Sequence, residues 1–216
     1  MQNLLQIVVL LFCICLCGCE TTDSTIKSEA SANSDVAYVH SYSKFSFPKQ
    51  IKQFQFAGVI QYDRDGRDVS VGYNSPTPVM ATVYVYPAAK NFTLVPSSPL
   101  QNVSKSLVDF EFKRREQEIF HAHPDAKLVT EEPFQITQGN NYFLGMRAVF
   151  LMNFRFGLFS KNSLSELYIF LIEPNVMFLV NDRQFVEYRI TYPTASKVEA
   201  EKEISSFLSE LKWSTK

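Results

Sequence analysis

The feature that most constrains this chain is a short apolar run at its N-terminus that ends among cysteines. The run from Leu4 to Leu16 reads LLQIVVLLFCICL and contains no charged residue. As a helix it would be about 20 Å long at 1.5 Å per residue, which is shorter than the roughly 30 Å hydrocarbon core of a bilayer. Its length is typical of the apolar segment of a signal peptide. We therefore expect it to direct the rest of the chain out of the cytoplasm.

The run leads into Leu16-Cys17-Gly18-Cys19 and then into a polar segment that begins at Glu20. These residues resemble the lipobox of the bacterial lipoprotein family, which has leucine at −3, a small residue at −1 and cysteine at +1. The resemblance implies that residues 1–19 are a signal peptide ending at the lipobox, and that Cys19 becomes a lipidated N-terminus. Two or three acyl chains would hold the domain on a membrane without a spanning helix. Glu20 is not the aspartate that this family uses for inner-membrane retention, which favours the outer membrane on its periplasmic side.

The same segment leaves alternatives open. They are an ordinary cleaved secretory signal, an uncleaved anchor and a palmitoylated N-terminus of a eukaryotic chain. All four cysteines (Cys13, Cys15, Cys17 and Cys19) lie in this segment, so the domain that follows has no disulfide. Alternating cysteines could indicate a metal cluster. Here they lie in an apolar segment without histidine, and we expect no metal.

Composition limits what the rest of the chain can be. The leader carries no charge and the chain has a formal net charge of −1, so no basic field is available to attract nucleic acid. Residues 20–37 are rich in Ser, Thr, Ala and Asp and predict a flexible tether with a reach of about 25 Å. Residues 38–216 have the length of one globular domain.

The first half of this domain has strand patterns. Phe45 to Pro48 is expected to be a short opening strand, and Val59–Tyr62 and Val69–Tyr73 flank Asp63–Asp68. Alternating apolar residues around an Asp-Gly pair predict a β-hairpin, because Gly66 adopts a positive φ at low cost. A further strand alternates between Val79, Ala81, Val83 and Val85 on one face and Thr82, Tyr84 and Tyr86 on the other.

The second half is expected to begin with a helix from Asn102 to Ala122. Its apolar residues fall on two sides, which predicts either a helix packed on the sheet with a loop over its back or an exposed apolar strip that meets a partner. Ala126 to Phe159 predicts two strands joined at residues 138–141. The inward face of the second contains Ala148, Phe150, Met152, Phe154, Phe156 and Leu158.

Leu167–Leu171 and Phe185–Tyr192 predict the last long strands, with a short one at Val176–Val180 between them. Ala195 to Trp213 predicts an amphipathic helix that begins with a capping box of Ser196 and Glu199 and is pinned to the sheet by Trp213. The fold class is therefore α+β, a predominantly antiparallel sheet flanked by helices, with the C-terminal helix packed on the sheet.

This order of elements resembles the PsbP-like α/β sandwich proteins. The residues that carry the resemblance are Phe45 to Pro48, Gly145-Met146-Arg147-Ala148 on a central strand, and Tyr192-Pro193 leading into a helix that ends at Trp213. The resemblance implies an antiparallel sheet flanked by helices and an accessory, non-enzymatic role in membrane-associated assemblies.

A search for catalytic motifs gives little. No cysteine lies outside the leader, and no G-x-G-x-x-G, P-loop, G-x-S-x-G or H-E-x-x-H motif is present. His121 and His123 could ligate a metal, but their place at a predicted helix end favours a structural role. The segment 111–118 (EFKRREQE) is expected to be a solvated helix face or a contact for a partner. Glu131 and Glu132 are expected on opposite faces of a strand.

The sequence therefore predicts a cell-envelope lipoprotein with a non-catalytic binding or assembly domain that needs no cofactor. Its partners would be the membrane, through the lipid, and another envelope protein. Aromatic residues are favoured at interfaces, and the candidate partner-binding residues are Tyr84, Tyr86, Phe154 and Phe156. The alternatives are a hydrolase or metal-dependent enzyme with dispersed site residues, and a carrier of a small ligand.

Overall fold

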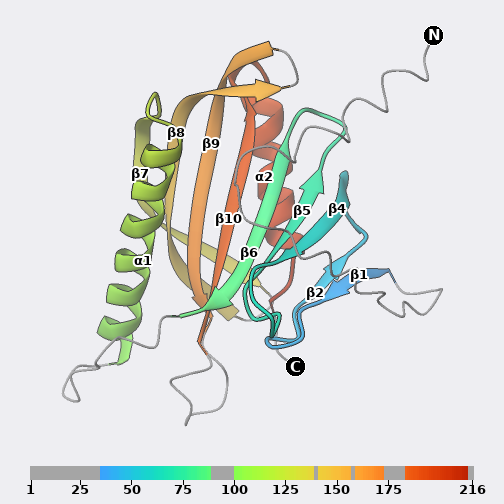
Figure 1. Cartoon of the computed structure of the whole chain (residues 1–216), viewed down its shortest axis with the longest axis vertical. Coiled ribbons are helices and arrows are strands. Elements are labelled where there is room, and N and C mark those ends of the chain that lie inside the picture. The colour runs from blue at the N-terminus through green and yellow to red at the C-terminus, as the bar shows by residue number, and fades with distance from the viewer. Residues whose placement is uncertain (1–34, 89–99, 139–140, 157–158, 173–182, 214–216) are drawn as a thin grey trace.

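The computed structural model describes residues 35–88, 100–138, 141–156, 159–172 and 183–213. Two helices and ten strands lie in these ranges, one after another along the chain as drawn in Figure 1. Their bounds are β1 (Val36–Val39), β2 (Ser46–Pro48), β3 (Gln50–Ile51), β4 (Phe54–Gln61), β5 (Val69–Asn74), β6 (Met80–Pro87), α1 (Leu100–Ala122), β7 (Lys127–Gln138), β8 (Asn141–Phe156), β9 (Phe159–Ile172), β10 (Gln184–Pro193) and α2 (Lys197–Glu210).

Eight strands form one antiparallel sheet in the order β3-β4-β5-β6-β10-β9-β8-β7, and β1 and β2 form a separate two-stranded sheet. The first four strands of the large sheet follow one another as a meander. The chain then crosses through α1 to the far edge and returns inward through β7, β8 and β9. This return places β10 beside β6 in the middle of the sheet. The α+β class expected from the sequence is thereby confirmed.

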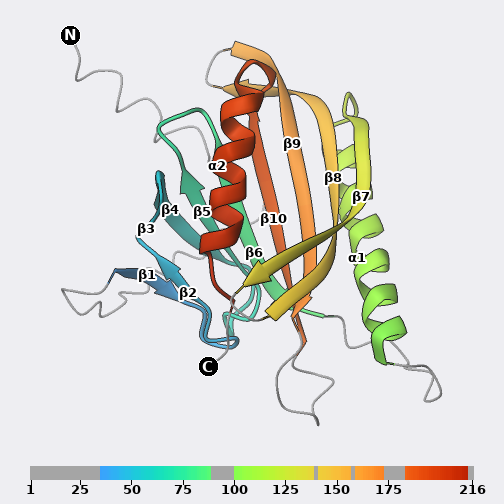
Figure 2. The same ribbon diagram turned by 180° about the vertical axis from the view of Figure 1, so that it is seen from behind.

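The two helices lie on opposite faces of this sheet, as Figures 1 and 2 show from the two sides. One face packs against α2, whose Ala200, Ile204, Phe207 and Leu208 share a core with β4, β5, β6 and β10. The other packs against α1, whose Leu107, Val108, Phe112 and Ile119 share a smaller core with β8 and β9. The sheet is therefore the middle of three layers, with α1 over the half formed by β8 and β9.

The predicted hairpin is confirmed. β4 and β5 pair in register from Val59↔Val71 to Gln61↔Val69, and Gly66 in the connecting loop has a φ of +64°. Asp63 organises this loop, because its Oδ1 accepts hydrogen bonds from the backbone N–H groups of Arg67 (2.8 Å) and Asp68 (3.3 Å). The alternation predicted for β6 is also correct, since Ala81, Val83 and Val85 on the α2 face, and Val79 just before the strand, are at most 1% exposed.

The first strand begins earlier than the sequence indicates. Val36 and Ala37, expected at the end of the tether, belong to β1 and pair with β2. β9 is also longer than expected, because it begins at Phe159 and not at Leu167. Its first residues are polar and carry no strand pattern. The predicted short strand at Val176–Val180 lies outside the described residues.

The C-terminal helix was predicted correctly, but its capping box was not. Ser196 makes no side-chain capping hydrogen bond. It is the last residue of a 3-10 turn (Thr194–Ser196) with φ −102° and ψ 15°, whereas a capping side chain normally comes from an extended residue. Trp213 is 2% exposed and its indole Nε1–H donates to the hydroxyl of Tyr188 at 2.7 Å, so the predicted contact with the sheet is confirmed.

The close packing of β8 against β9 gives the first prediction. A Cβ atom at Gly145 would lie 2.3 Å from the carbonyl oxygen of Ile169 and 2.6 Å from the ring of Phe170. We expect Gly145→Ala to lower the free energy of unfolding by about 1–3 kcal/mol, because the strands must move apart. Gly72→Ala is the matched control: its Cβ would meet only Ala57 at 3.6 Å and the Gly58 carbonyl oxygen at 3.9 Å. Urea denaturation should show a loss below about 1 kcal/mol for this control, and equal losses would contradict the argument.

Candidate functional site

A charged residue lies at the centre of the sheet. Glu187 on β10 is 0% exposed and faces α1. Its Oε2 accepts a hydrogen bond from the hydroxyl of Tyr86 on β6 at 2.9 Å and lies 3.0 Å from Nε of Arg115 on α1. Its Oε1 accepts from Nε of Arg189 at 2.5 Å. Both oxygens of this carboxylate therefore have partners, as burial of a charge requires.

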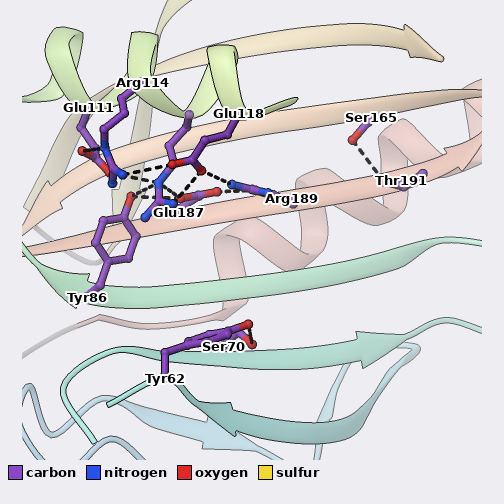
Figure 3. Close-up of polar contacts among 11 residues, drawn as sticks. Tyr62, Ser70, Tyr86, Glu111, Arg114, Glu118, Ser165, Glu187, Arg189 and Thr191 are labelled. Carbon is purple, nitrogen blue, oxygen red and sulfur yellow. Dashed lines mark hydrogen bonds and ion pairs between the residues drawn. The ribbon is translucent and has the colours of Figure 1, made fainter. Parts of the chain in front are cut away.

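The side chains of α1 extend this arrangement, as Figure 3 shows. Arg114 binds the carboxylate of Glu111 with two nitrogens, at 2.9 and 2.5 Å. Arg115 bridges Glu111 at 3.0 Å and Glu118 at 2.9 Å, and Glu118 also lies 3.5 Å from Arg189 on the sheet. We call these residues the ion cluster: Glu111, Arg114, Arg115, Glu118, Glu187 and Arg189. It contains three carboxylates and three guanidinium groups, so its formal charge is zero.

The ion cluster corrects the expectation that residues 111–118 form a solvated helix face. Glu111 and Glu116 are 5% and 7% exposed, because this part of α1 lies against the sheet. The apolar residues Leu107, Val108, Phe112 and Ile119 also pack on the sheet. Phe110 on the other side is 56% exposed. The segment 89–99, which would have to supply the predicted covering loop, lies outside the described residues.

Burial and charge set the titration of this region. Burial alone would lower the pKa of Arg115, but the charge of Glu187 and the phenol of Tyr86 outweigh it and raise the pKa. Burial and the neighbouring Glu187 raise the pKa of Tyr86 well above its ordinary value. For Glu111, burial would raise the pKa, but the hydrogen bonds and charges of Arg114 and Arg115 lower it. The surroundings of Arg115 and Glu111 therefore favour the charged form of each.

Next to the ion cluster, neither helix of the described residues lies over β4, β5 and β6 on the α1 face of the sheet (Figure 1). The strand register places residues here in rows across the strands. One row is Ile60, Ser70, Tyr84 and Glu187, and the next is Gly58, Gly72, Thr82 and Arg189. A Cβ at Gly58 would have nothing within 4 Å. We call this surface the open strip: Gly58, Ile60, Tyr62, Ser70, Gly72, Thr82 and Tyr84.

Two tyrosines border the open strip. The rings of Tyr62 and Tyr84 stack with centroids 6.5 Å apart and planes inclined by 21°. The hydroxyl of Tyr62 is 3.0 Å from Oγ of Ser70, which holds its ring along β5 (Figure 3), and Tyr62 remains 54% exposed. The guanidinium group of Arg189 lies over the ring of Tyr84, with Cζ 5.1 Å from the ring centroid. Burial raises the pKa of Tyr84 to about 12.

The α2 face has its own buried carboxylate. Glu166 on β9 is 1% exposed and accepts hydrogen bonds from Tyr192 at 2.5 Å, from Tyr168, and from Arg147 at 2.9 and 3.0 Å. Arg147 also donates to Glu132 at 2.8 Å. Every group around this carboxylate donates to it, so the arrangement holds β8 and β9 together and leaves no carboxylate oxygen free for chemistry.

The structure separates the four residues predicted to bind a partner. Tyr84 and Tyr86 are neighbours on β6, but Tyr86 is 5% exposed and its hydroxyl is bound to Glu187. Phe154 lies on β8, which β10 and β9 separate from β6. It is near the end of α1, with its ring 6.4 Å from that of His123. The side chain of Phe156 lies outside the described residues. Only Tyr84 belongs to the open strip, and partner binding by these residues stays a prediction.

The remaining polar predictions have clear outcomes. Glu131 contacts Lys113 of α1 at 2.6 Å, whereas Glu132 contacts Arg147 on the other face, so these two carboxylates are separated as predicted. His123 directly follows α1, and its backbone N–H donates a hydrogen bond to the backbone carbonyl of Ile119 at 2.8 Å. Within the described part of the chain, no group of three or more His, Cys, Asp or Glu side chains could hold a metal ion.

The sequence contains a signal for the buried charges. Glu187 and Arg189 are two positions apart among the apolar residues Phe185, Val186, Tyr188 and Ile190. Residues two apart in a strand share a face. A charged pair at this spacing inside an apolar strand therefore indicates a buried pair that needs partners from another element.

Comparison with known proteins gives this chain no relative, since neither a protein-family model nor a curated protein sequence matches it. Among the described residues, neither helix is long and apolar enough to cross a membrane.

The ion cluster gives the second prediction. Glu187→Ala leaves Arg115 and Arg189 partly buried without their shared carboxylate. We expect a loss of about 3–5 kcal/mol in the free energy of unfolding, the usual cost of removing one partner from a buried ion pair. Lys197→Ala is the control: it breaks only the exposed pair with Glu201, at 3.7 Å, and should cost less than about 1 kcal/mol. Urea denaturation at pH 7 measures both, and similar losses would show that Glu187 does not stabilise the fold.

Asp68, beside the open strip, gives a pH prediction. Burial raises its pKa, and the charge of Arg115 opposes this only in part. A carboxyl with a raised pKa in the folded state stabilises the fold when protonated, and this stabilisation is lost as pH rises from the unfolded value of about 3.9 through the folded value. Asp68→Asn should therefore unfold at a higher urea concentration than the native protein at pH 7, and at nearly the same concentration at pH 3.

Asp65→Asn, at an exposed position of the same loop, is the control for Asp68→Asn. It should leave the midpoint little changed at both pH values. If the native protein is instead more stable than Asp68→Asn at pH 7, the attraction of Arg115 outweighs the cost of burying the Asp68 carboxylate. The predicted direction of the stability change is then wrong.

Proposed function

We propose that this protein is a cell-envelope lipoprotein whose folded domain is a non-catalytic binding module. The lipid would be attached at Cys19, the position that resembles the lipobox cysteine. Residues 20–34, between Cys19 and the first described residue, would separate the domain from the membrane surface. Glu20 supports a location at the outer membrane, on its periplasmic side.

The observation that supports binding is the open strip. Ile60 and Tyr62 are exposed on it, and it combines aromatic rings, hydroxyl groups and a charged pair at one end. Ligand sites typically combine apolar or aromatic surface with a few fixed polar groups. The strip is held in shape by the β4–β5–β6 ladders and by the ion cluster, which fixes α1 at its border.

The state of the titratable groups supports a role without catalysis. The buried carboxylates of Glu187 and Glu166 are each held by guanidinium and phenol donors. A general base must reach and accept a proton from its substrate, and these oxygens would first have to lose a charged partner. Glu118 is the partly exposed carboxylate of the ion cluster, and it is shared between arginines.

The anchor is tested by replacing its cysteine. With Cys19→Ser in a bacterial host, we expect the acyl chains to be absent from the intact mass and the protein to leave the membrane fraction. Cys17→Ser, which changes a cysteine at −2, should remain lipidated and membrane-bound. A Cys19→Ser protein that is processed normally and stays on the membrane would show that the lipid is not at this residue. Crosslinking followed by mass spectrometry of the lipidated native protein would identify its envelope partner.

A further inference from the structure

Two adjacent positions of the open strip carry no side chain, and we call their backbone the floor of the strip. Gly58 on β4 and Gly72 on β5 are directly paired across the strands, so two neighbouring positions of this row present only backbone. Thr82 on β6 continues the row, and Arg189 on β10 ends it beside Glu118 of α1. The row crosses three strand-to-strand spacings, or about 15 Å. A chain-like ligand could therefore lie across the strands along this row.

The border of the strip is aromatic and fixed in orientation. Tyr62 is anchored by its hydroxyl at Ser70 and by stacking on Tyr84, which is itself held against Arg189. A rigid, exposed tyrosine gives a large contact area at a small cost in conformational entropy. Ile60 is the one large aliphatic side chain of the strip, and it is 59% exposed. Such a border suits a ligand with small apolar faces rather than a long acyl chain.

The charges at the end of the strip indicate a ligand without net charge. Arg189 and Glu118 lie 3.5 Å apart, with side chains 30% and 41% exposed. The ion cluster has no net formal charge, so it does not attract an anion or a cation by net charge. The pair instead offers donors beside acceptors. Hydroxyl groups are complementary to both, because each donates one hydrogen bond and accepts others.

We propose that the open strip binds a neutral glycan chain. Such a chain presents C–H faces that pack on tyrosine rings and many hydroxyl groups for Arg189, Glu118, Thr82 and the floor backbone. This inference rests on the proposed function, since an extracytoplasmic location places the domain among cell-envelope polysaccharides. A fatty acyl chain and an anionic polymer are the competing occupants, and the experiment separates them.

The test uses the full-length protein in detergent micelles and isothermal titration calorimetry. The probes are the neutral hexasaccharides chitohexaose, maltohexaose and mannohexaose, with the hexamer of galacturonic acid as the anionic probe and palmitate as the apolar one. We expect at least one neutral hexasaccharide to bind with one site per chain and to bind more tightly than the anionic hexamer or palmitate. Tyr62→Ala should weaken that binding about tenfold, the equivalent of about 1.4 kcal/mol.

Tyr142→Ala is the matched control, because Tyr142 is 66% exposed on β8 and lies five strand positions from β4 in the sheet. It should bind the sugar like the native protein. Gly72→Ala, which places a methyl group on the floor without a clash, should also weaken binding. Thermal unfolding of each variant establishes that the fold is retained.

The proposal is overturned if no neutral hexasaccharide binds, if the anionic hexamer or palmitate binds more tightly, or if Tyr62→Ala binds the sugar as the native protein does. These results are separate from those for the anchor. A lipidated Cys19 with no sugar binding would leave the lipoprotein in place and remove only the ligand class. Sugar binding by a chain that is not lipidated at Cys19 would support the ligand class and remove the lipid anchor.

Discussion

The carboxylate of Glu187 has no solvent exposure and lies on a central strand, so its charge must be balanced inside the protein. Arg189 comes from the same strand, Tyr86 from the neighbouring strand and Arg115 from α1. The helix is thus held to the sheet by charge as well as by apolar packing. Its position follows from this contact, since Arg115 can reach Glu187 only when α1 lies along the border of β10.

The two faces of the sheet reach stability in different ways. On the α2 face, Tyr73, Phe170, Tyr188, Phe207 and Trp213 form one aromatic cluster with contacting ring centroids 5.0 to 6.3 Å apart. Burial of such rings needs a helix over the middle of the sheet. On the α1 face the middle of the sheet carries charges, hydroxyl groups and glycines instead. Glu187 is covered there by α1 through Arg115, whereas Ile60 and Tyr62 remain 59% and 54% exposed.

This asymmetry connects the fold to the proposed function. One face supplies most of the apolar core, and the other can present a binding surface without losing that core. The ion cluster then serves two purposes at once. It fixes α1, and through Arg189 and Glu118 it ends the open strip with a donor and an acceptor whose positions are set by several partners.

The local elements could be predicted because their signals are local. Asp65-Gly66 with alternating flanks predicted the hairpin, and the valines of β6 predicted its buried face. The long β9 was missed in part because Ser163, Ser165 and Glu166 are buried at 0%, 8% and 1% exposure despite their polarity. Their burial depends on neighbouring strands, because Ser165 contacts Thr191 and Glu166 is bound by Arg147 and Tyr192. A pattern along one segment does not contain these partners.

The sequence by itself determined the α+β class, the hairpin, the faces of β6 and the amphipathic C-terminal helix, because each depends on spacing within a few residues. Only the tertiary structure decided that Glu111 and Glu116, within residues 111–118, are buried rather than part of a solvated face. Tyr86 and Glu187 are separated by 101 positions along the chain. The energetic value of a charge depends on the groups that surround it in space, and those groups are brought together only by folding.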